Sequence, residues 1–205
     1  MEFKEVLLRR RTIRDFSTRP VAAGEIQEAV SHAFLAPSYN HLKQWYFLIV
    51  DDPEKKIRLT ETEEMHDEVS GELEKAFRDH DPAAREMYLQ AIPKQRKMIL
   101  QAPLVIAAVY RPKTRVSEAV RVYDLNGLAS IWCAIENFLL SLAEKDIFGV
   151  TFIPKNTDKV KKVLGIPEEL EVAALIPVGY KQEGAAVPEP KKTVLEEHVK
   201  FNGWS

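Results

Sequence analysis

The sequence predicts an α+β domain with a central sheet flanked by helices. Short apolar runs rich in β-branched and aromatic residues are mixed with helical segments, without the regular β-α-β rhythm of a parallel sheet. No Gly-rich turn links a strand to a helix, which argues against a Rossmann or P-loop site. The chain has 205 residues, 45% of them hydrophobic, enough for one sizeable core, so we expect a single domain over residues 1–205.

The first fifty residues predict two helices and one strand. Apolar residues at helical spacing over 3–7 indicate a short helix that runs into an arginine-rich loop. Residues 26–34 show a second amphipathic pattern, which Pro37 ends because proline cannot continue a helix. The apolar run at 45–50 then predicts a buried strand.

Residues 53–103 are the least core-like part of the chain. Their pattern is helical and polar, with acidic residues dense between 61 and 74 and with Pro82 and Pro93 as interruptions. We expect a helical, lid-like insertion at about 55–102. It is either a solvated helical hairpin or a mobile lid over a site.

The second half predicts three strands around a long helix. The strands are expected at 104–110, 148–153 and 171–178. Residues 125–144 are apolar nearly all round and predict a central helix. A short helix with Asn156 or Thr157 as its cap ends at Gly165. The tail beyond Tyr180 finishes in large apolar residues and is expected to dock on another subunit.

Composition argues against several kinds of partner and chemistry. A formal net charge of -2 and a pI near 6.2 give no bulk reason to expect nucleic acid. Neither a membrane span nor a secretory leader is expected. The single cysteine, Cys133, is expected to be a packed thiol and fits a reducing, cytoplasmic compartment. Scattered histidines and the lack of a Gly-x-Ser-x-Gly motif disfavour a metal site and a serine hydrolase.

The N-terminal cluster is the first candidate site. Arg10, Arg11 and Arg14 concentrate positive charge beside the hydroxyl of Thr12, in a chain that is acidic overall. Guanidinium groups bind phosphate oxygens in bidentate fashion, and a hydroxyl adds a hydrogen bond. The cluster therefore indicates a phosphate site, or else a helix end whose arginines favour the macrodipole and solvent.

Three further segments carry polar groups at the ends of predicted elements. The turn at 36–41 joins the second helix to the first strand, and the segment at 150–156 leads into a helix N-terminus. Lys191 and Lys192 lie in the tail. Loops of this kind present polar groups to ligands, although each segment alone also fits a simple connector.

Taken in order, these features resemble the FMN-dependent nitroreductase superfamily. The stretch 10–16, Arg-Arg-Thr-Ile-Arg-Asp-Phe, resembles its opening motif R-R-S-x-R-x-F, with Thr12 in place of serine. Ala36-Pro37-Ser38 followed by Trp45 looks like its A-P-S loop. The helix at 125–144, Ile153-Pro154, the strand at 176–180 and the tail are similar to later family elements. The resemblance spans almost the whole chain except roughly 55–102.

This resemblance implies a three-layer nitroreductase-like fold and a homodimer with FMN at the subunit interface, the C-terminal tail reaching the partner. The FMN-binding residues it implies are Arg10, Arg11, Thr12, Arg14, Pro37, Ser38, Tyr39, His41, Phe152, Ile153, Pro154, Lys191 and Lys192. The turn at 36–41 would come from the partner subunit, and no side chain need act as a catalyst because FMN carries the chemistry. Electrons would pass by a ping-pong reaction from NAD(P)H to a nitroaromatic, quinone or similar acceptor.

One departure from the family pattern bears on the acceptor. Where many members have N-x-Q-P-W, this chain has His41-Leu42-Lys43-Gln44-Trp45. A histidine after the A-P-S turn is similar to the dehalogenating branch of the superfamily. The alternatives are therefore a reductive dehalogenase-like enzyme, in which the insertion closes over the substrate, and a flavin-binding protein without turnover.

Overall fold

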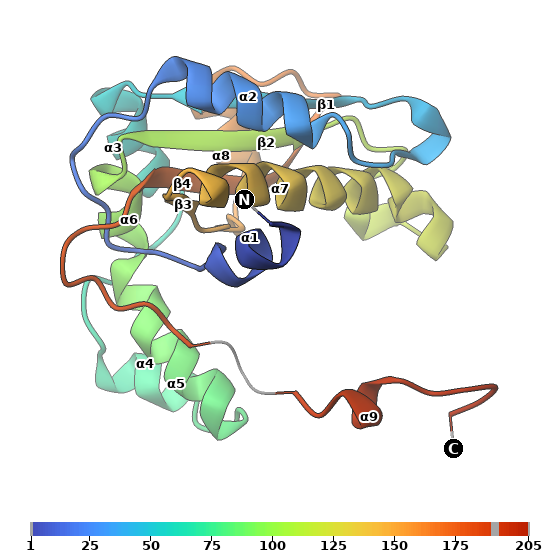
Figure 1. Ribbon diagram of the computed structural model, residues 1–205. Coiled ribbons are helices and arrows are strands. Elements are labelled where there is room, and N and C mark those ends of the chain that lie inside the picture. Colours follow the sequence, from blue (N-terminus) through green and yellow to red (C-terminus); the bar gives the residue numbers. More distant parts are fainter. Residues whose placement is uncertain (1, 190–192, 205) are drawn as a thin grey trace.

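A four-stranded antiparallel sheet forms the centre of the protein (Figure 1). The computed structural model describes residues 2–189 and 193–204. The strands, in the spatial order β1-β2-β4-β3, are β1 (Trp45–Val50), β2 (Leu104–Tyr110), β4 (Glu171–Tyr180) and β3 (Ile147–Gly149). The predicted α+β class with a mostly antiparallel sheet is confirmed.

Helices cover both faces of this sheet, because successive strand residues point to opposite sides. On β2, Ile106 and Ala108 lie in one buried cluster and Val105 and Ala107 in a second. The first cluster is covered by α2 (Ala23–Ala33) and α7 (Asn126–Glu144). The second is covered by α3 (Pro53–Thr60), α6 (Gln95–Gln101) and α8 (Thr157–Leu164). The result is a three-layer arrangement of helices, sheet and helices.

Local signals in the sequence set several helix ends. Asp52 caps α3 by accepting hydrogen bonds from the backbone N–H groups of residues 54 and 55, and Pro53 occupies its first turn. Asn156 caps α8 by accepting from the Lys159 N–H, and Gly165 ends that helix with a left-handed φ of 67°. The predicted cap and stop of α8 are therefore confirmed.

The third predicted strand, at 148–153, is shorter in the structure. Regular pairing of β3 with β4 ends at Gly149, and beyond it only Phe152 forms a bridge, with Leu175. Gly149 lies so close to α7 that a Cβ there would be 2.9 Å from Leu139 Cδ2. The chain nevertheless stays beside β4 as far as Phe152, because the Val150 N–H donates to the Pro177 carbonyl oxygen and Phe152 pairs with Leu175 in the same register.

The central helix α7 buries one side rather than its whole circumference. Ile131, Ile135, Phe138 and Leu142 are buried, whereas Cys133 is exposed. The expectation of a packed thiol is wrong for the single chain, because Cys133 faces away from the sheet. By length and composition the stretch Val122–Glu144 would suffice to cross a membrane, a test that the core helix of a soluble protein also passes.

The insertion divides into a packed part and a projecting part. Leu59 of α3 and Met98 and Ile99 of α6 belong to the core. Between them, α4 (Gly71–Ala76) and α5 (Pro82–Ala91) extend away from the sheet (Figure 1). Only this middle portion projects from the body of the protein, and its role as a lid stays a prediction.

The remaining elements are short and lie at the periphery. They are α1 (Phe3–Arg9), η1 (Tyr39–His41), η2 (Ile92–Lys94), η3 (Val116–Glu118), η4 (Val122–Leu125) and α9 (Leu195–His198). The tail that carries α9 runs away from the body of the protein (Figure 1). Phe201 and Trp204 are 82% and 89% exposed there, so the single chain gives them no apolar surface to pack on.

Candidate functional site

The arginine-rich loop after α1 is fixed to the edge of the sheet. Thr12 forms a parallel bridge with Gly149, and Phe16 forms an antiparallel bridge with Lys181. The buried side chains of Ile13 and Phe16 belong to the core. Thr12 and Arg14, on either side of Ile13, are only partly buried.

The arginines of this loop differ in their partners. Arg9 pairs with Asp146 and Arg10 with Glu136, each at 3.3 Å and on the surface. Arg11 Nη1 donates to the Arg10 carbonyl oxygen at 2.8 Å. Among the described residues, Arg14 forms no ion pair, which would require a carboxylate oxygen within 4.0 Å of a guanidinium nitrogen.

Arg14 is therefore a partly desolvated cation that lacks a carboxylate partner. Burial lowers the pKa of its guanidinium, and the charge of the neighbouring Asp15 only partly offsets this. A desolvated charge is costly unless an opposite charge or hydrogen-bond acceptors compensate it. An anion at this position would supply that compensation.

A cavity of about 300 Å³ opens beside Arg14. Its lining residues are Thr12, Arg14, Asp15, Gln90, Lys94, Ala186 and Pro188. Three separate segments thus meet here: the arginine loop, the C-terminal end of the insertion and the beginning of the tail. Lys191 and Lys192, which the family resemblance predicts to bind FMN, lie outside the described residues.

Asp15 connects the insertion to the arginine loop. Its carboxylate lies 2.6 Å from Lys94 Nζ and 3.6 Å from Lys97 Nζ. Burial alone raises the pKa of Asp15, but the hydrogen bond and charge of Lys94, together with Lys97, bring it below its usual value. Sequence reasoning missed Lys94, because no local pattern shows that residues 79 positions apart share a cavity.

The turn after α2 is held in a strained conformation. Asn40, His41 and Lys43 have φ angles of 49°, 57° and 47°, in the left-handed region that residues other than glycine seldom adopt. Three such residues within four positions are costly and persist only where surrounding contacts hold them. The Tyr39 N–H donates to Ser130 Oγ at 3.0 Å, and the Lys43 N–H donates to Ser38 Oγ at 3.3 Å. Pro37 and His41 are exposed, so the turn presents side chains at the surface of the single chain.

One chain does not bring this turn to the arginine loop. Tyr39 contacts Ser130 near the beginning of α7, whereas Arg10 contacts Glu136 further along that helix. Six helical residues correspond to about 9 Å along the axis. Figure 1 shows the turn after α2 beside the beginning of α7, with α1 under its later part. In the single chain the two segments therefore contact different parts of α7, and their meeting in one FMN site across a subunit interface stays a prediction.

The segment at 150–156 offers a different surface from the one expected. The Phe152 side chain is buried in the core, and its backbone N–H and carbonyl both bond to Leu175. Pro154 is buried, whereas Ile153 is 64% exposed. Ile153 lines a cavity of about 600 Å³ together with Trp132 and Arg115. Contact of this segment with a flavin ring stays a prediction, with Ile153 as its exposed side chain.

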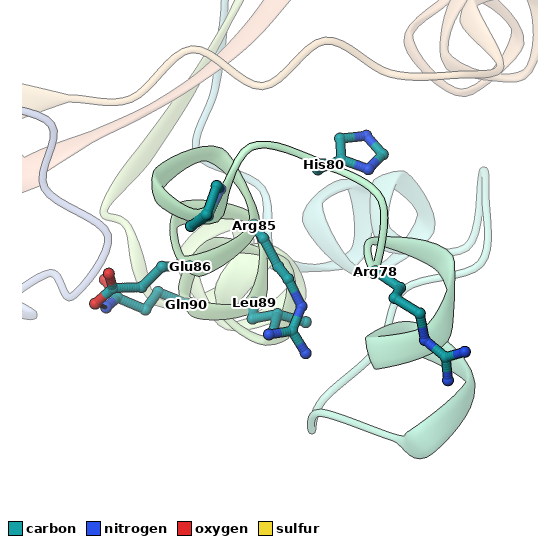
Figure 2. A pocket seen from close by; sticks show the side chains of 7 residues that line it. Arg78, His80, Arg85, Glu86, Leu89 and Gln90 are labelled. Carbon is teal, nitrogen blue, oxygen red and sulfur yellow. Dashed lines mark hydrogen bonds between the residues drawn. The ribbon is translucent and has the colours of Figure 1, made fainter.

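A further cavity of about 420 Å³ lies on the insertion (Figure 2). It is lined by Arg78, His80, Pro82, Arg85, Glu86, Leu89 and Gln90. Nearby, the rings of Phe77 and Tyr88 stack with centroids 4.8 Å apart and hold α4 against α5. This cavity contains none of the predicted FMN-binding residues, and only Gln90 also lines the cavity beside Arg14.

Comparison with known proteins places these features in a family. The model of the nitroreductase family matches residues 7–180, which include the arginine loop, the strained turn and all four strands. The chain belongs to the nitroreductase family. Both the predicted family and the predicted three-layer fold are thereby confirmed.

Among curated relatives of this nitroreductase-family chain are several iodotyrosine deiodinases. The chain is 28% identical to iodotyrosine deiodinase 1 of Rattus norvegicus over 204 residues, covering 96% of this chain and 68% of that protein. It is 27% identical to the iodotyrosine deiodinase of Thermotoga neapolitana over 194 residues, covering 95% of this chain and 94% of that protein.

Solved structures of the family share this fold. An oxidised iodotyrosine deiodinase bound to FMN and 3-iodo-L-tyrosine gives a TM-score of 0.76 at 20% identity, covering 98% of this chain and 100% of that one. An FMN-dependent nitroreductase from Clostridium difficile R20291 gives 0.66 at 20% identity, covering 97% and 98%. At such identities the likeness concerns the fold.

Proposed function

We propose that this protein is an FMN-dependent oxidoreductase that works as a homodimer. The observation that carries the proposal is Arg14, a partly desolvated cation without a carboxylate partner beside a cavity that Thr12 and Lys94 also line. A phosphate group matches this donor set, because it takes bidentate bonds from a guanidinium and further bonds from a hydroxyl and an ammonium. Relatives of this chain have been solved with FMN.

In this proposal each segment has its own task. Arg14, Arg11 and Thr12 bind the phosphate end of the cofactor, while the strained turn of a partner subunit covers the far side of the flavin ring. When bound, FMN supplies the chemistry, by taking a hydride from a nicotinamide donor and passing electrons to an acceptor. The protein contributes positive charge, orientation and exclusion of water.

For the acceptor, we favour a halogenated phenol, from which two electrons and a proton release halide and leave a C–H bond. Two observations support this choice: curated relatives at 26–28% identity are named iodotyrosine deiodinases, and His41 follows the A-P-S turn. The second candidate is reduction of a nitroaromatic or a quinone, which the family name and the FMN-dependent nitroreductase structure support.

The first test of this proposal is whether the purified protein binds FMN and is therefore yellow. Purified protein incubated with FMN and passed through gel filtration is expected to retain flavin absorbance at about one FMN per chain. The yellow protein, reduced with dithionite under anaerobic conditions, is then mixed with 2-iodophenol or with 4-nitrotoluene. Iodide release with the first and slower reoxidation with the second are expected. A colourless protein refutes the proposal, and reoxidation by the nitro compound alone favours the second candidate.

The dimer itself is tested through the tail. Phe201 and Trp204 are almost fully exposed, and we expect them to pack on the partner subunit. The double variant Phe201→Ser/Trp204→Ser is expected to shift sedimentation at micromolar concentration from dimer toward monomer, and to lower the FMN content with it. The neighbouring substitution Lys200→Ala is the matched control. A double variant that sediments as the unchanged protein does would show that the tail has no part in association.

A further inference from the structure

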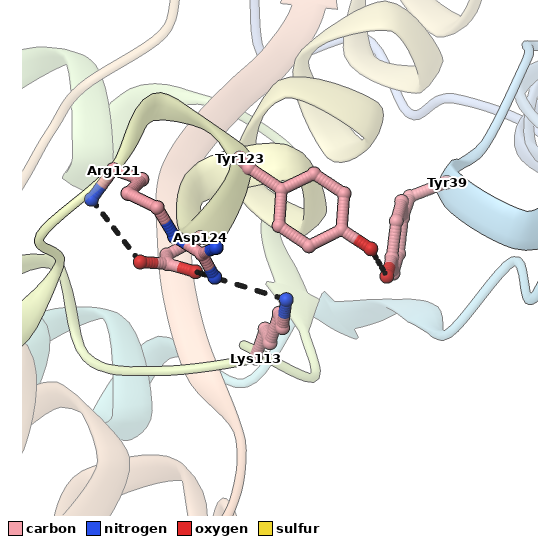
Figure 3. A network of polar contacts seen from close by, with 5 residues as sticks. All are labelled: Tyr39, Lys113, Arg121, Tyr123 and Asp124. Atoms are coloured by element: carbon pink, nitrogen blue, oxygen red, sulfur yellow. Dashed lines mark hydrogen bonds and ion pairs between the residues drawn. The ribbon is translucent and has the colours of Figure 1, made fainter.

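A pair of tyrosine hydroxyls joins the strained turn to the segment that precedes α7. The hydroxyl groups of Tyr39 and Tyr123 are hydrogen-bonded to each other, and Figure 3 shows their side chains pointing toward one another from these two segments. The rings meet edge to face, with centroids 5.4 Å apart and an interplanar angle of 86°. Tyr123 is 46% exposed, so the pair is accessible from outside the chain.

The two hydroxyls together hold one proton that their own hydrogen bond does not use. Each phenol has a single O–H, and only one of the two can lie between the oxygen atoms. The hydrogen bond with Tyr123, together with burial, raises the pKa of Tyr39, so Tyr39 stays protonated near neutral pH. The remaining O–H can therefore donate to an acceptor atom of a bound molecule.

Positive charge surrounds this pair. Lys113 Nζ lies 3.7 Å from the centroid of the Tyr123 ring, and Arg121 lies 5.4 Å from it. Both cations share one carboxylate, Asp124, at 3.7 Å from Lys113 and 3.1 Å from Arg121 (Figure 3). Arg121 makes a hydrogen bond to that carboxylate, whereas Lys113 lies beyond hydrogen-bond distance of it. Lys113 thus retains donor groups, and the cluster has a surplus of one positive charge.

We propose that Lys113 and the Tyr39–Tyr123 pair bind an anionic oxygen, a carboxylate or a phenolate, on the aromatic electron acceptor. The inference rests on the proposed function, in which the turn that contains Tyr39 covers the flavin of the partner subunit. Lys113 supplies the charge, and the free O–H of the pair supplies a directional hydrogen bond. Together they select acidic acceptors over neutral ones of the same shape.

The test compares matched acceptors in the flavin-loaded protein. Steady-state reduction of 4-nitrobenzoate is measured beside its neutral methyl ester, and 4-nitrophenolate beside 4-nitroanisole. The variant Lys113→Gln is expected to lower kcat/KM for the anionic member of a pair by about 10-fold or more, mainly through KM, and to change that for the neutral member less than 2-fold. Whichever pair shows the effect identifies the anionic group.

A matched variant and a binding measurement separate recognition from a structural role. Lys55→Gln removes an exposed lysine from α3. In each pair of acceptors, it is expected to leave the ratio of kcat/KM for the anionic member to that for the neutral member unchanged. The Kd of unreactive benzoate for the oxidised protein, read from the flavin absorbance, is expected to rise in Lys113→Gln and, by a smaller factor, in Tyr123→Phe. Binding of neutral benzamide is expected to stay the same.

Failure of this inference differs from failure of the proposed function. A protein that binds no FMN refutes both, before any acceptor is tested. This inference alone is refuted by a different result. In that case the protein is yellow and reduces the methyl ester, and Lys113→Gln shows the same preference between acidic and neutral acceptors as the unchanged chain. Equal losses for both members of each pair also refute it, because they indicate a structural role for Lys113.

Discussion

Arg14→Ala is expected to weaken FMN binding by about 10-fold to 100-fold, the effect of losing charged hydrogen bonds of about 1.5–3 kcal/mol. Arg14 has no carboxylate partner among the described residues, so its removal leaves no buried anion uncompensated. The loss therefore reports the contact with the cofactor rather than a broken ion pair. Titration of the apoprotein with FMN, followed by the quenching of flavin fluorescence, measures the Kd.

Two controls make this result specific to the guanidinium at position 14. Arg14→Lys keeps the charge but loses the bidentate geometry, so an intermediate affinity is expected. Arg9→Ala removes a nearby arginine whose side chain pairs with Asp146 on the surface. This variant should change the Kd for FMN less than 2-fold. An unchanged affinity in Arg14→Ala would place the phosphate elsewhere.

Periodicity predicted the elements that lie in the core, and it failed where neighbours decide. The runs at 45–50 and 104–110 became β1 and β2 at the predicted bounds, and β2 is buried along nearly its whole length. The expectation that 45–50 is a buried strand is wrong for the single chain, because β1 lies at the edge of the sheet with Tyr46, Leu48 and Ile49 exposed. The third strand pairs regularly only to Gly149, although Phe152 still pairs with Leu175 in the same register. The exposure of a strand depends on which elements lie beside it, and a local pattern does not show that.

The candidate site shows the same division. The arginine loop and the turn at 36–41 were identified from residue types, because charge and hydrogen-bonding groups are visible in the sequence. Lys94 and Tyr123 were not identified, because their partners are distant in the sequence. Lys94 lies 79 positions from Asp15, and Tyr123 lies 84 positions from Tyr39. Cys133 was placed in the core because the helix pattern is apolar nearly all round, whereas the single chain covers only one side of α7.

Phe138→Ala is expected to lower the free energy of unfolding by about 3–5 kcal/mol, a large fraction of the 5–15 kcal/mol typical of a folded protein. Phe138 is fully buried at the middle of α7 and stacks on Phe47 of β1, with centroids 5.4 Å apart. The cavity left behind would remove contacts from both the helix and the sheet. Urea denaturation at a single protein concentration measures the change, because the stability of a dimer depends on concentration.

The same substitution links stability to the site. Ser130 holds the strained turn, and Glu136 pairs with Arg10. Both residues belong to α7 and precede Phe138 on that helix. A loosened helix would let both halves of the site shift, so FMN affinity is expected to fall together with stability. Phe138→Leu keeps most of the apolar volume and should lose less than about half as much. If the free energy of unfolding of Phe138→Ala instead lies within about 1 kcal/mol of the value for the unchanged chain, the packing of Phe138 is not what keeps α7 and the two site segments in place.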